Sequence, residues 1–194
     1  MKSYIIKSLK YIISICLISS YCFILFNSTH INVPFEYKRF YLDKMFMDWP
    51  GINGLDYSLN TNLMFGLEHN DSLVKCRGTG WNNFEDNGTW TQDDAKLYLN
   101  LKEEVKDDKT LKLVLGKAMP DIKVHILIND KEVSSFQPDQ YKQEYEFKIP
   151  KEFFGDKFLC LNFKVDNCSY ITDVNKPREK ILAGMFVESI NLGT

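Results

Sequence analysis

The stretch Ala95-Lys96-Leu97-Tyr98-Leu99-Asn100-Leu101 places an apolar residue at every second position. A period of two is typical of a β-strand with one face on a core and the other toward solvent. The same alternation recurs along the chain, at residues 111–115, 124–128, 145–149 and 159–165. Short strands at this spacing predict an all-β fold, an antiparallel β-sandwich or jelly roll.

Turn residues separate these segments in the way that such a fold needs. Asn129-Asp130 stands between two strand patterns and predicts a short hairpin. Pro150 and Gly155 bound a short segment that predicts a single helical turn. Residues 181–192 are more continuously apolar, so we expect a strand that is buried on both faces.

Residues 1–30 predict one apolar helix ahead of the β-fold. Lys2, Lys7 and Lys10 precede the run Tyr11–Phe26, which carries no charge. A basic head before an apolar run is typical of an export signal or a membrane anchor. Three fates remain open: an uncleaved anchor, a cleaved signal, or a lipoprotein modified at Cys22. We expect the anchor, because small residues suited to cleavage are poorly placed after Phe26.

The rest of the chain divides into an approach segment, residues 31–55, and a β-domain, residues 56–194. Lysines before the apolar run place the amino end in the cytoplasm and the domain outside it, at a bacterial cytoplasmic membrane. The approach is rich in aromatic residues between Phe35 and Trp49. Such residues lie at the lipid headgroups near a span or cover one end of the domain, and the sequence leaves both open.

Charge and motif content exclude several classes of function. Without Lys2, Lys7 and Lys10, the 24 basic residues fall to 21 against 26 acidic ones, and no basic stripe is present, so we expect no nucleic-acid partner. The three histidines have no zinc-ligand spacing, and we predict no metal and no cofactor. No nucleophile motif is recognisable, so we do not expect an enzyme.

Three of the five cysteines lie outside the apolar run: Cys76, Cys160 and Cys168. An oxidising exterior permits one disulfide among them, with Cys160–Cys168 and Cys76–Cys168 as the two candidates. The alternative is that Cys160, between Leu159 and Leu161, is a buried thiol.

The segment Gly78–Trp90 holds the candidate binding residues Trp81, Glu85 and Trp90. Exposed indoles would stack on the apolar face of a sugar ring, and the carboxylate of Glu85 would hold its hydroxyl groups. The alternative is that both indoles fill the end of the core, because buried aromatic side chains contribute a large apolar area. Glu85 would then accept hydrogen bonds from nearby backbone N–H groups.

Two asparagines stand in extended glycosylation sequences. Glu68 lies two residues before Asn70, and Glu85 lies two residues before Asn87; each asparagine has Ser or Thr two positions later. This form is similar to the acceptor of bacterial oligosaccharyl transferases. Modification of Asn87 would compete with a binding role for Glu85.

Several short motifs from Asp56 to Leu192 resemble an uncharacterised, carbohydrate-binding-like β-sandwich domain appended to bacterial membrane sugar or phosphoglycerol transferase-like proteins. The motifs are Phe65-Gly66, Gly80-Trp81, Glu85, Gly88, Trp90, the 95–101 strand, Ile128-Asn129-Asp130-Lys131, Tyr145-x-Phe147-x-Ile149-Pro150 and Arg178–Gly184. Asp130 stands where glycine is commoner, and the spacing around Asp173 and Arg178 departs from the pattern. The polytopic transferase portion is absent from this sequence.

The resemblance implies a setting in cell-surface polysaccharide assembly, with Arg178 as a further binding candidate. We therefore expect an anchored, non-catalytic accessory or glycan-binding module, whose partners are the membrane, a saccharide and envelope membrane proteins. The alternative is a protein-interaction module of an envelope complex, without sugar binding, that docks through the aromatic approach segment.

Overall fold

The computed structural model describes residues 2–29, 33–139, 143–155, 157–173 and 176–193. The chain divides into two compact units, residues 1–34 and residues 35–194.

The first unit contains the helix α1 (Lys2–Thr29). Among the described residues, α1 is the one helix that is long and apolar enough to cross a membrane. The apolar part is Lys10–Ser28, with a mean hydropathy of 1.7. Nineteen residues of helix extend about 28 Å at ~1.5 Å per residue, close to the roughly 30 Å of a bilayer core. A signal sequence has the same length and composition, so the predicted apolar helix is confirmed while its fate stays a prediction.

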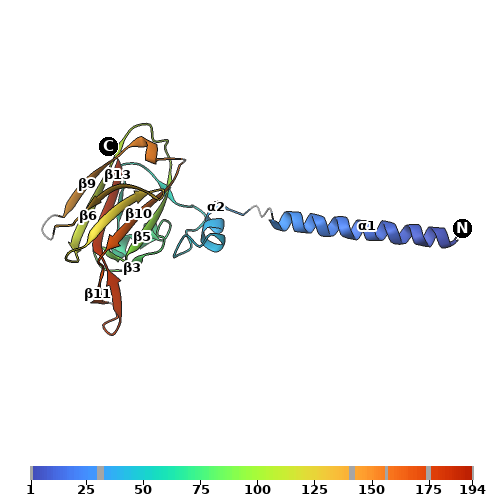
Figure 1. The fold of residues 1–194 in the computed structure, drawn as a ribbon, viewed down its shortest axis with the longest axis horizontal. Coiled ribbons are helices and arrows are strands. Elements are labelled where there is room, and N and C mark those ends of the chain that lie inside the picture. Colours follow the sequence, from blue (N-terminus) through green and yellow to red (C-terminus); the bar gives the residue numbers. More distant parts are fainter. Residues whose placement is uncertain (1, 30–32, 140–142, 156, 174–175, 194) are drawn as a thin grey trace. The chain divides into compact units, whose positions relative to one another are not determined.

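The second unit begins with short elements and is otherwise built of strands (Figure 1). The short elements are α2 (Phe35–Tyr37), η1 (Lys38–Leu42), β1 (Asp56–Tyr57), β2 (Asn62–Met64), η2 (Leu67–His69) and α3 (Asn70–Leu73). The all-β prediction for this unit is confirmed at the level of its strands and sheets.

One sheet has five strands in the order β1-β5-β10-β7-β8. Its neighbours are antiparallel except for the parallel pair β1 and β5. The four longer strands are β5 (Asp94–Leu101), β7 (Lys123–Ile128), β8 (Lys131–Phe136) and β10 (Phe158–Asp166).

The other large sheet runs β3-β4-β13-β6-β9, with β2 also paired to β13. Figure 1 shows β9, β6 and β13 as neighbours in this sheet. A separate two-stranded sheet joins β11 and β12. The strands are β3 (Trp81–Phe84), β4 (Thr89–Thr91), β6 (Lys109–Ala118), β9 (Glu144–Ile149), β11 (Ser169–Thr172), β12 (Lys180–Ala183) and β13 (Met185–Gly193).

The two large sheets share one hydrophobic core. The alternating residues of β5, at 95, 97, 99 and 101, are all buried in it, and so are Leu111, Leu113 and Leu115 of β6. A period of two places these side chains on one face of each sheet. The strands expected at 95–101, 111–115, 124–128, 145–149 and 159–165 are confirmed as parts of β5, β6, β7, β9 and β10.

Two predicted turns are also confirmed. Asn129 and Asp130 have φ values of 49° and 65° and connect β7 to β8, which are paired as a hairpin. Two consecutive positive φ values are the mark of a type I′ turn, which asparagine and aspartate tolerate. Residues 151–153 form the short helix η3 (Lys151–Phe153) directly after Pro150.

The approach segment packs with the strands across residue 55, where the sequence predicts a boundary. Phe46 and Leu55 are buried in the main core, and Arg77 pairs with Asp48 at 3.1 Å. The aromatic segment therefore belongs to the same compact unit as the strands, and the chain divides after Pro34. The composition of this segment leaves open whether it lies at the headgroups or covers one end of the domain. The burial of Phe46 shows that part of the segment packs on the core.

Candidate functional site

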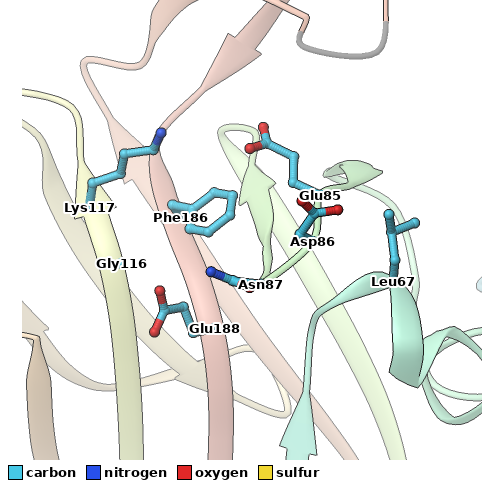
Figure 2. A pocket seen from close by; sticks show the side chains of 8 residues that line it. All are labelled: Leu67, Glu85, Asp86, Asn87, Gly116, Lys117, Phe186 and Glu188. Carbon is cyan, nitrogen blue, oxygen red and sulfur yellow. The ribbon is translucent and has the colours of Figure 1, made fainter.

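An open pocket of about 440 Å³ lies on the six-stranded sheet beside the turn between β3 and β4. We name it the Glu85 pocket. The turn contributes Glu85, Asp86 and Asn87, while β6 and β13 contribute Lys117, Phe186 and Glu188. Figure 2 shows the Phe186 ring between Lys117 on one strand and Asn87 on the turn.

Paired irregularities in the sheet shape this pocket. Along β6 and β13, Phe186 pairs with Lys117, Val187 with Leu115, and the next pair is Ser189 with Val114. Gly116 and Glu188 are therefore left out of the pairing on facing strands. Bulges redirect side chains and occur often beside functional sites. Here they bring Glu188 to the pocket next to Phe186, with Gly116 opposite.

Gly116 gives the pocket its room. A Cβ atom at this position would stand 2.5 Å from Oε1 of Glu188 and 2.9 Å from Cδ1 of Phe186. Any other residue would push the carboxylate away or fill the space above the ring. The glycine is thus explained by the close approach of two pocket side chains.

Backbone contacts hold the β3–β4 turn in place. The N–H of Glu85 donates to the carbonyl of Gly88 at 2.8 Å, and the N–H of Leu67 donates to the carbonyl of Glu85 at 3.1 Å. Gly66 lies against the turn so closely that a Cβ atom there would collide with the carbonyl oxygen of Asp86. The carboxylates and the amide of this turn are therefore presented by a fixed backbone.

A small second hydrophobic cluster forms the floor of the pocket. The rings of Trp90 and Phe186 meet at 5.3 Å between centroids, nearly edge to face. The ammonium group of Lys117 lies 5.2 Å from the Trp90 ring and 5.3 Å from the Phe186 ring. This geometry fits a cation–π contact, so the aromatic pair helps to orient the lysine.

The pocket carries more negative than positive charge. Glu85, Asp86 and Glu188 face a single lysine, Lys117. Carboxylates accept hydrogen bonds, lysine donates them, and the Asn87 amide does both. The arrangement suits a neutral or amine-bearing ligand with several hydroxyl groups and disfavours an anionic one.

A neighbouring hollow of about 460 Å³ extends the site along the turn. It shares Asp86, Asn87 and Glu188 with the Glu85 pocket and adds Glu68 and His69 of η2. The two hollows offer room for more than one ring of an extended ligand.

The structure corrects the interpretation of the two tryptophans as exposed stacking platforms. Trp81 is 2% exposed and Trp90 is 4% exposed. Trp81 packs in the main core against Phe65 and Phe163, with centroid distances of 4.9 and 6.3 Å. Trp90, on β4, packs beside its cross-strand partner Phe186. Burial supports the alternative interpretation for Trp81, which fills the main core, whereas Trp90 is buried in the small second cluster.

The predicted site residues are only partly brought together. Glu85 lines the pocket, and Trp90 does not line it but packs against the lining residue Phe186. Arg178 is an exposed residue between β11 and β12 and is not among the residues that line either hollow. Asp173 is buried, and the Asn83 side chain approaches its carboxylate at 3.5 Å.

Both candidate glycosylation asparagines are exposed, but their surroundings differ. Thr89, two residues after Asn87, is fully buried, and its hydroxyl donates to the carbonyl of Asn82 at 2.9 Å. Ser72, two residues after Asn70, is exposed on α3. Modification of Asn87 would therefore have to precede folding of the turn.

The two candidate disulfides are not formed, and geometry gives the reason for Cys160 and Cys168. Both are free thiols, as is Cys76. Residues 160–166 run straight along β10, about 20 Å at ~3.3 Å per residue, and Cys168 follows that strand. A disulfide needs Cα atoms about 4.4–6.8 Å apart. Burial also raises the pKa of the Cys160 thiol to about 11 and that of Cys76 to about 12.

Sequence reasoning missed Gly116, Lys117, Phe186 and Glu188. These residues approach the β3–β4 turn only because β13 pairs with both β4 and β6. Their alternation resembles that of any other strand, and a bulge leaves no clear mark in one sequence. The nearest signal was Gly116, a glycine inside a strand pattern. Within the described residues, no group of three or more His, Cys, Asp or Glu side chains is arranged to hold a metal.

Comparison with known proteins adds little to this geometry. No protein-family model matches the sequence, and no curated protein is similar to it. Among solved structures, it is similar to a family 35 carbohydrate binding module from an environmental isolate, with a TM-score of 0.35 and 12% identity over 60% of this chain and 74% of that one. At this level the likeness places no ligand on the present chain. The resemblance to transferase-appended domains finds no support in these searches.

Proposed function

We propose that the second unit is a β-sandwich that binds a saccharide in the Glu85 pocket, without catalysis. The observation that carries this proposal is the pair of bulges at Gly116 and Glu188. The bulges leave space beside Phe186, and polar side chains line that space around the ring. Sugars present apolar C–H faces together with many hydroxyl groups. An aromatic floor within a rim of carboxylates, an amide and an ammonium group matches both.

The Phe186 ring is 6% exposed, so it forms a floor and offers no broad stacking platform. Most of the binding energy would then come from hydrogen bonds of the rim, each of which replaces a bond to water. We expect weak binding, at millimolar to high-micromolar dissociation constants, or about 4 to 6 kcal/mol.

We further propose that α1 is retained as a single-pass anchor in a bacterial cytoplasmic membrane, with the domain outside the cytoplasm. The length of the apolar segment and the lysines before it support this topology. A role in cell-surface polysaccharide assembly is inferred from the short sequence motifs alone.

The state of the thiols argues against nucleophilic catalysis by cysteine. Cys76 is buried, and burial raises its pKa to about 12. Cys168 also has a pKa raised by burial, to about 11. Thiols in this state are protonated near neutral pH and are poor nucleophiles.

The second candidate function is a protein-interaction module, favoured by the exposed aromatic residues between Phe35 and Trp49. Deleting this segment would remove Phe46 from the core, so deletion is a poor test. Co-purification from membranes with a Tyr41→Ser, Trp49→Ser variant is the better one. Loss of a stoichiometric protein partner would favour docking.

The saccharide proposal is tested with the full chain in detergent micelles against panels of neutral, amine-bearing and anionic oligosaccharides. We expect binding of a neutral or amine-bearing glycan that weakens at least about fivefold, or ~1 kcal/mol, in Glu188→Gln. Glu146→Gln, which removes an exposed carboxylate from β9, is the matched control. Absence of binding to every class, or equal binding by both variants, would contradict the proposal.

A further inference from the structure

A compact group of aromatic rings, three exposed and one half-buried, lies at the start of the second unit. We name Tyr37, Phe40, Tyr41 and Trp49 the aromatic patch. The Tyr37 and Tyr41 rings meet at 4.5 Å, and Trp49 lies 5.5 Å from Phe40 and 5.5 Å from Tyr41. Trp49 is 39% exposed and Tyr41 is 46% exposed, and Leu42 beside them is exposed as well. Contiguous apolar surface of this kind marks a contact site in soluble domains.

The patch is firmly seated on the β-domain. Phe40 packs against the main core, and Phe46 is buried within it. The guanidinium of Arg39 lies 3.8 Å from the centre of the Phe158 ring, a cation–π contact that fixes η1 on β10. The backbone N–H of Met45 donates to the carbonyl of Arg39 at 2.9 Å. The rings therefore form a fixed surface of the domain.

The sequence tethers this surface to the apolar helix. Residues 30–34 alone lie between the end of α1 at Thr29 and Phe35. The six steps from Thr29 to Phe35 extend at most about 20 Å at ~3.4 Å per residue. A surface that is tethered so closely to a bilayer meets it at a high effective concentration, so even a weak contact is populated.

The chemistry of the patch fits the lipid headgroup region. Tyrosine and tryptophan present an apolar ring with one polar group and are enriched at membrane interfaces. Exposed Lys38 and Lys44 are offset by Glu36 and Asp43, so the local charge is balanced. Partition of the rings, and not attraction to anionic lipid, would drive the contact.

We propose that the aromatic patch lies in the headgroup region of the membrane that holds α1. This inference depends on the proposed retention of α1 and is independent of saccharide binding. The contact would limit rotation of the domain and hold one end of it on the bilayer surface.

Trp49 provides the test, because the other two tryptophans are buried. The full chain is reconstituted in phosphatidylcholine vesicles with and without lipids that carry a quencher near the headgroup. The Trp49 signal is obtained by subtracting the emission of a Trp49→Phe variant. We expect quenching of at least about half of this signal, and no change with salt or with added anionic lipid.

A second pair of variants separates the patch from the anchor. Tyr41→Ser is expected to reduce the quenching of Trp49, whereas Tyr170→Ser, at an exposed tyrosine of β11, leaves it unchanged. A chain that stays with the vesicles while Trp49 is unquenched would overturn the patch proposal and leave anchoring intact. Trp49 emission that is unquenched by the lipid and shifts to shorter wavelength only after addition of a membrane protein fraction would assign the patch to a protein partner instead. Release of the chain from native membranes after cleavage of α1 would overturn both the anchor and the patch.

Discussion

The indole Nε1 of Trp81 donates a hydrogen bond of 2.8 Å to the backbone carbonyl of Lys96. Trp81 lies on β3 of the six-stranded sheet, whereas Lys96 lies on β5 of the five-stranded sheet. The bond therefore joins the two sheets across the end of the core, and the indole that carries it is 2% exposed. This residue stabilises the domain that presents the Glu85 pocket.

Replacement of Trp81 by alanine is expected to lower the free energy of unfolding by about 3–5 kcal/mol, through lost apolar burial and a cavity. Trp49→Ala is the matched control; this side chain is 39% exposed, and we expect a change of about 1 kcal/mol or less. Denaturant unfolding of both variants measures the difference. Equal losses in the two variants would show that Trp81 is not a core residue.

A substitution at Gly80 tests how closely the segment that precedes β3 approaches β5. Gly80 has a φ of 83°, and a Cβ atom there would collide with the Asp94 carbonyl oxygen. Gly51 has a similar φ of 77° but open space around it. We expect Gly51→Ala to cost about 1–2 kcal/mol from backbone strain alone. Gly80→Ala should cost at least about 1–3 kcal/mol more from overpacking. Thermal unfolding that ranks the two variants equally would contradict the close approach.

The buried thiol of Cys76 predicts a loss of stability in alkali. Burial raises its pKa from 9.0 to about 12, so the folded chain keeps a proton that the unfolded chain loses. The stability that this group contributes is complete below pH 9 and declines as the pH rises toward 12, by up to about 1.4 kcal/mol per pH unit.

The measurement is the free energy of unfolding at pH 8 and pH 10 for the parent chain and for Cys76→Ala. Burial also raises the pKa of Tyr98 to about 12, and this tyrosine is present in both proteins. The difference between the two proteins should therefore shrink with rising pH. A difference that stays constant would place the thiol in contact with water.

Filling the Glu85 pocket at Gly116 should abolish binding without unfolding the domain. The added methyl group would meet the flexible end of Glu188, so we expect a stability loss of about 1–3 kcal/mol. Saccharide affinity should fall at least about tenfold, or ~1.4 kcal/mol, because both the carboxylate and the space are displaced. Gly155→Ala, at a position with nothing within 4 Å, is the control. Unchanged affinity in Gly116→Ala would move the ligand elsewhere.

The strands could be predicted because each apolar alternation is local. Residues 95–101 form part of β5, and the Asn129-Asp130 turn connects β7 to β8, because the pleat and the type I′ turn depend on neighbouring residues. The division of strands between sheets could not be predicted in this way. β5 and β6 are consecutive in sequence but lie in different sheets, and alternation does not specify a strand's partner.

The candidate site was only partly predictable for the same reason. Glu85 was identified from its turn, which is a local feature. Glu188 and Lys117 reach the pocket through pairings of β13 with β4 and β6 that join residues far apart in sequence. The burial of Trp81 depends on Phe65 and Phe163, two other distant residues. An aromatic residue in a glycine-rich segment has the same local sequence whether it is covered or exposed.

The most direct test of saccharide binding is an NMR titration of the second unit, residues 35–194, which has its own core. A glycan identified in the binding panels is added while backbone amide shifts are followed. We predict saturable shifts grouped at Asn87, Gly116, Lys117 and Glu188, with little change at Arg178. Shifts that gather around Arg178, or no saturable shift at the pocket, would contradict the account.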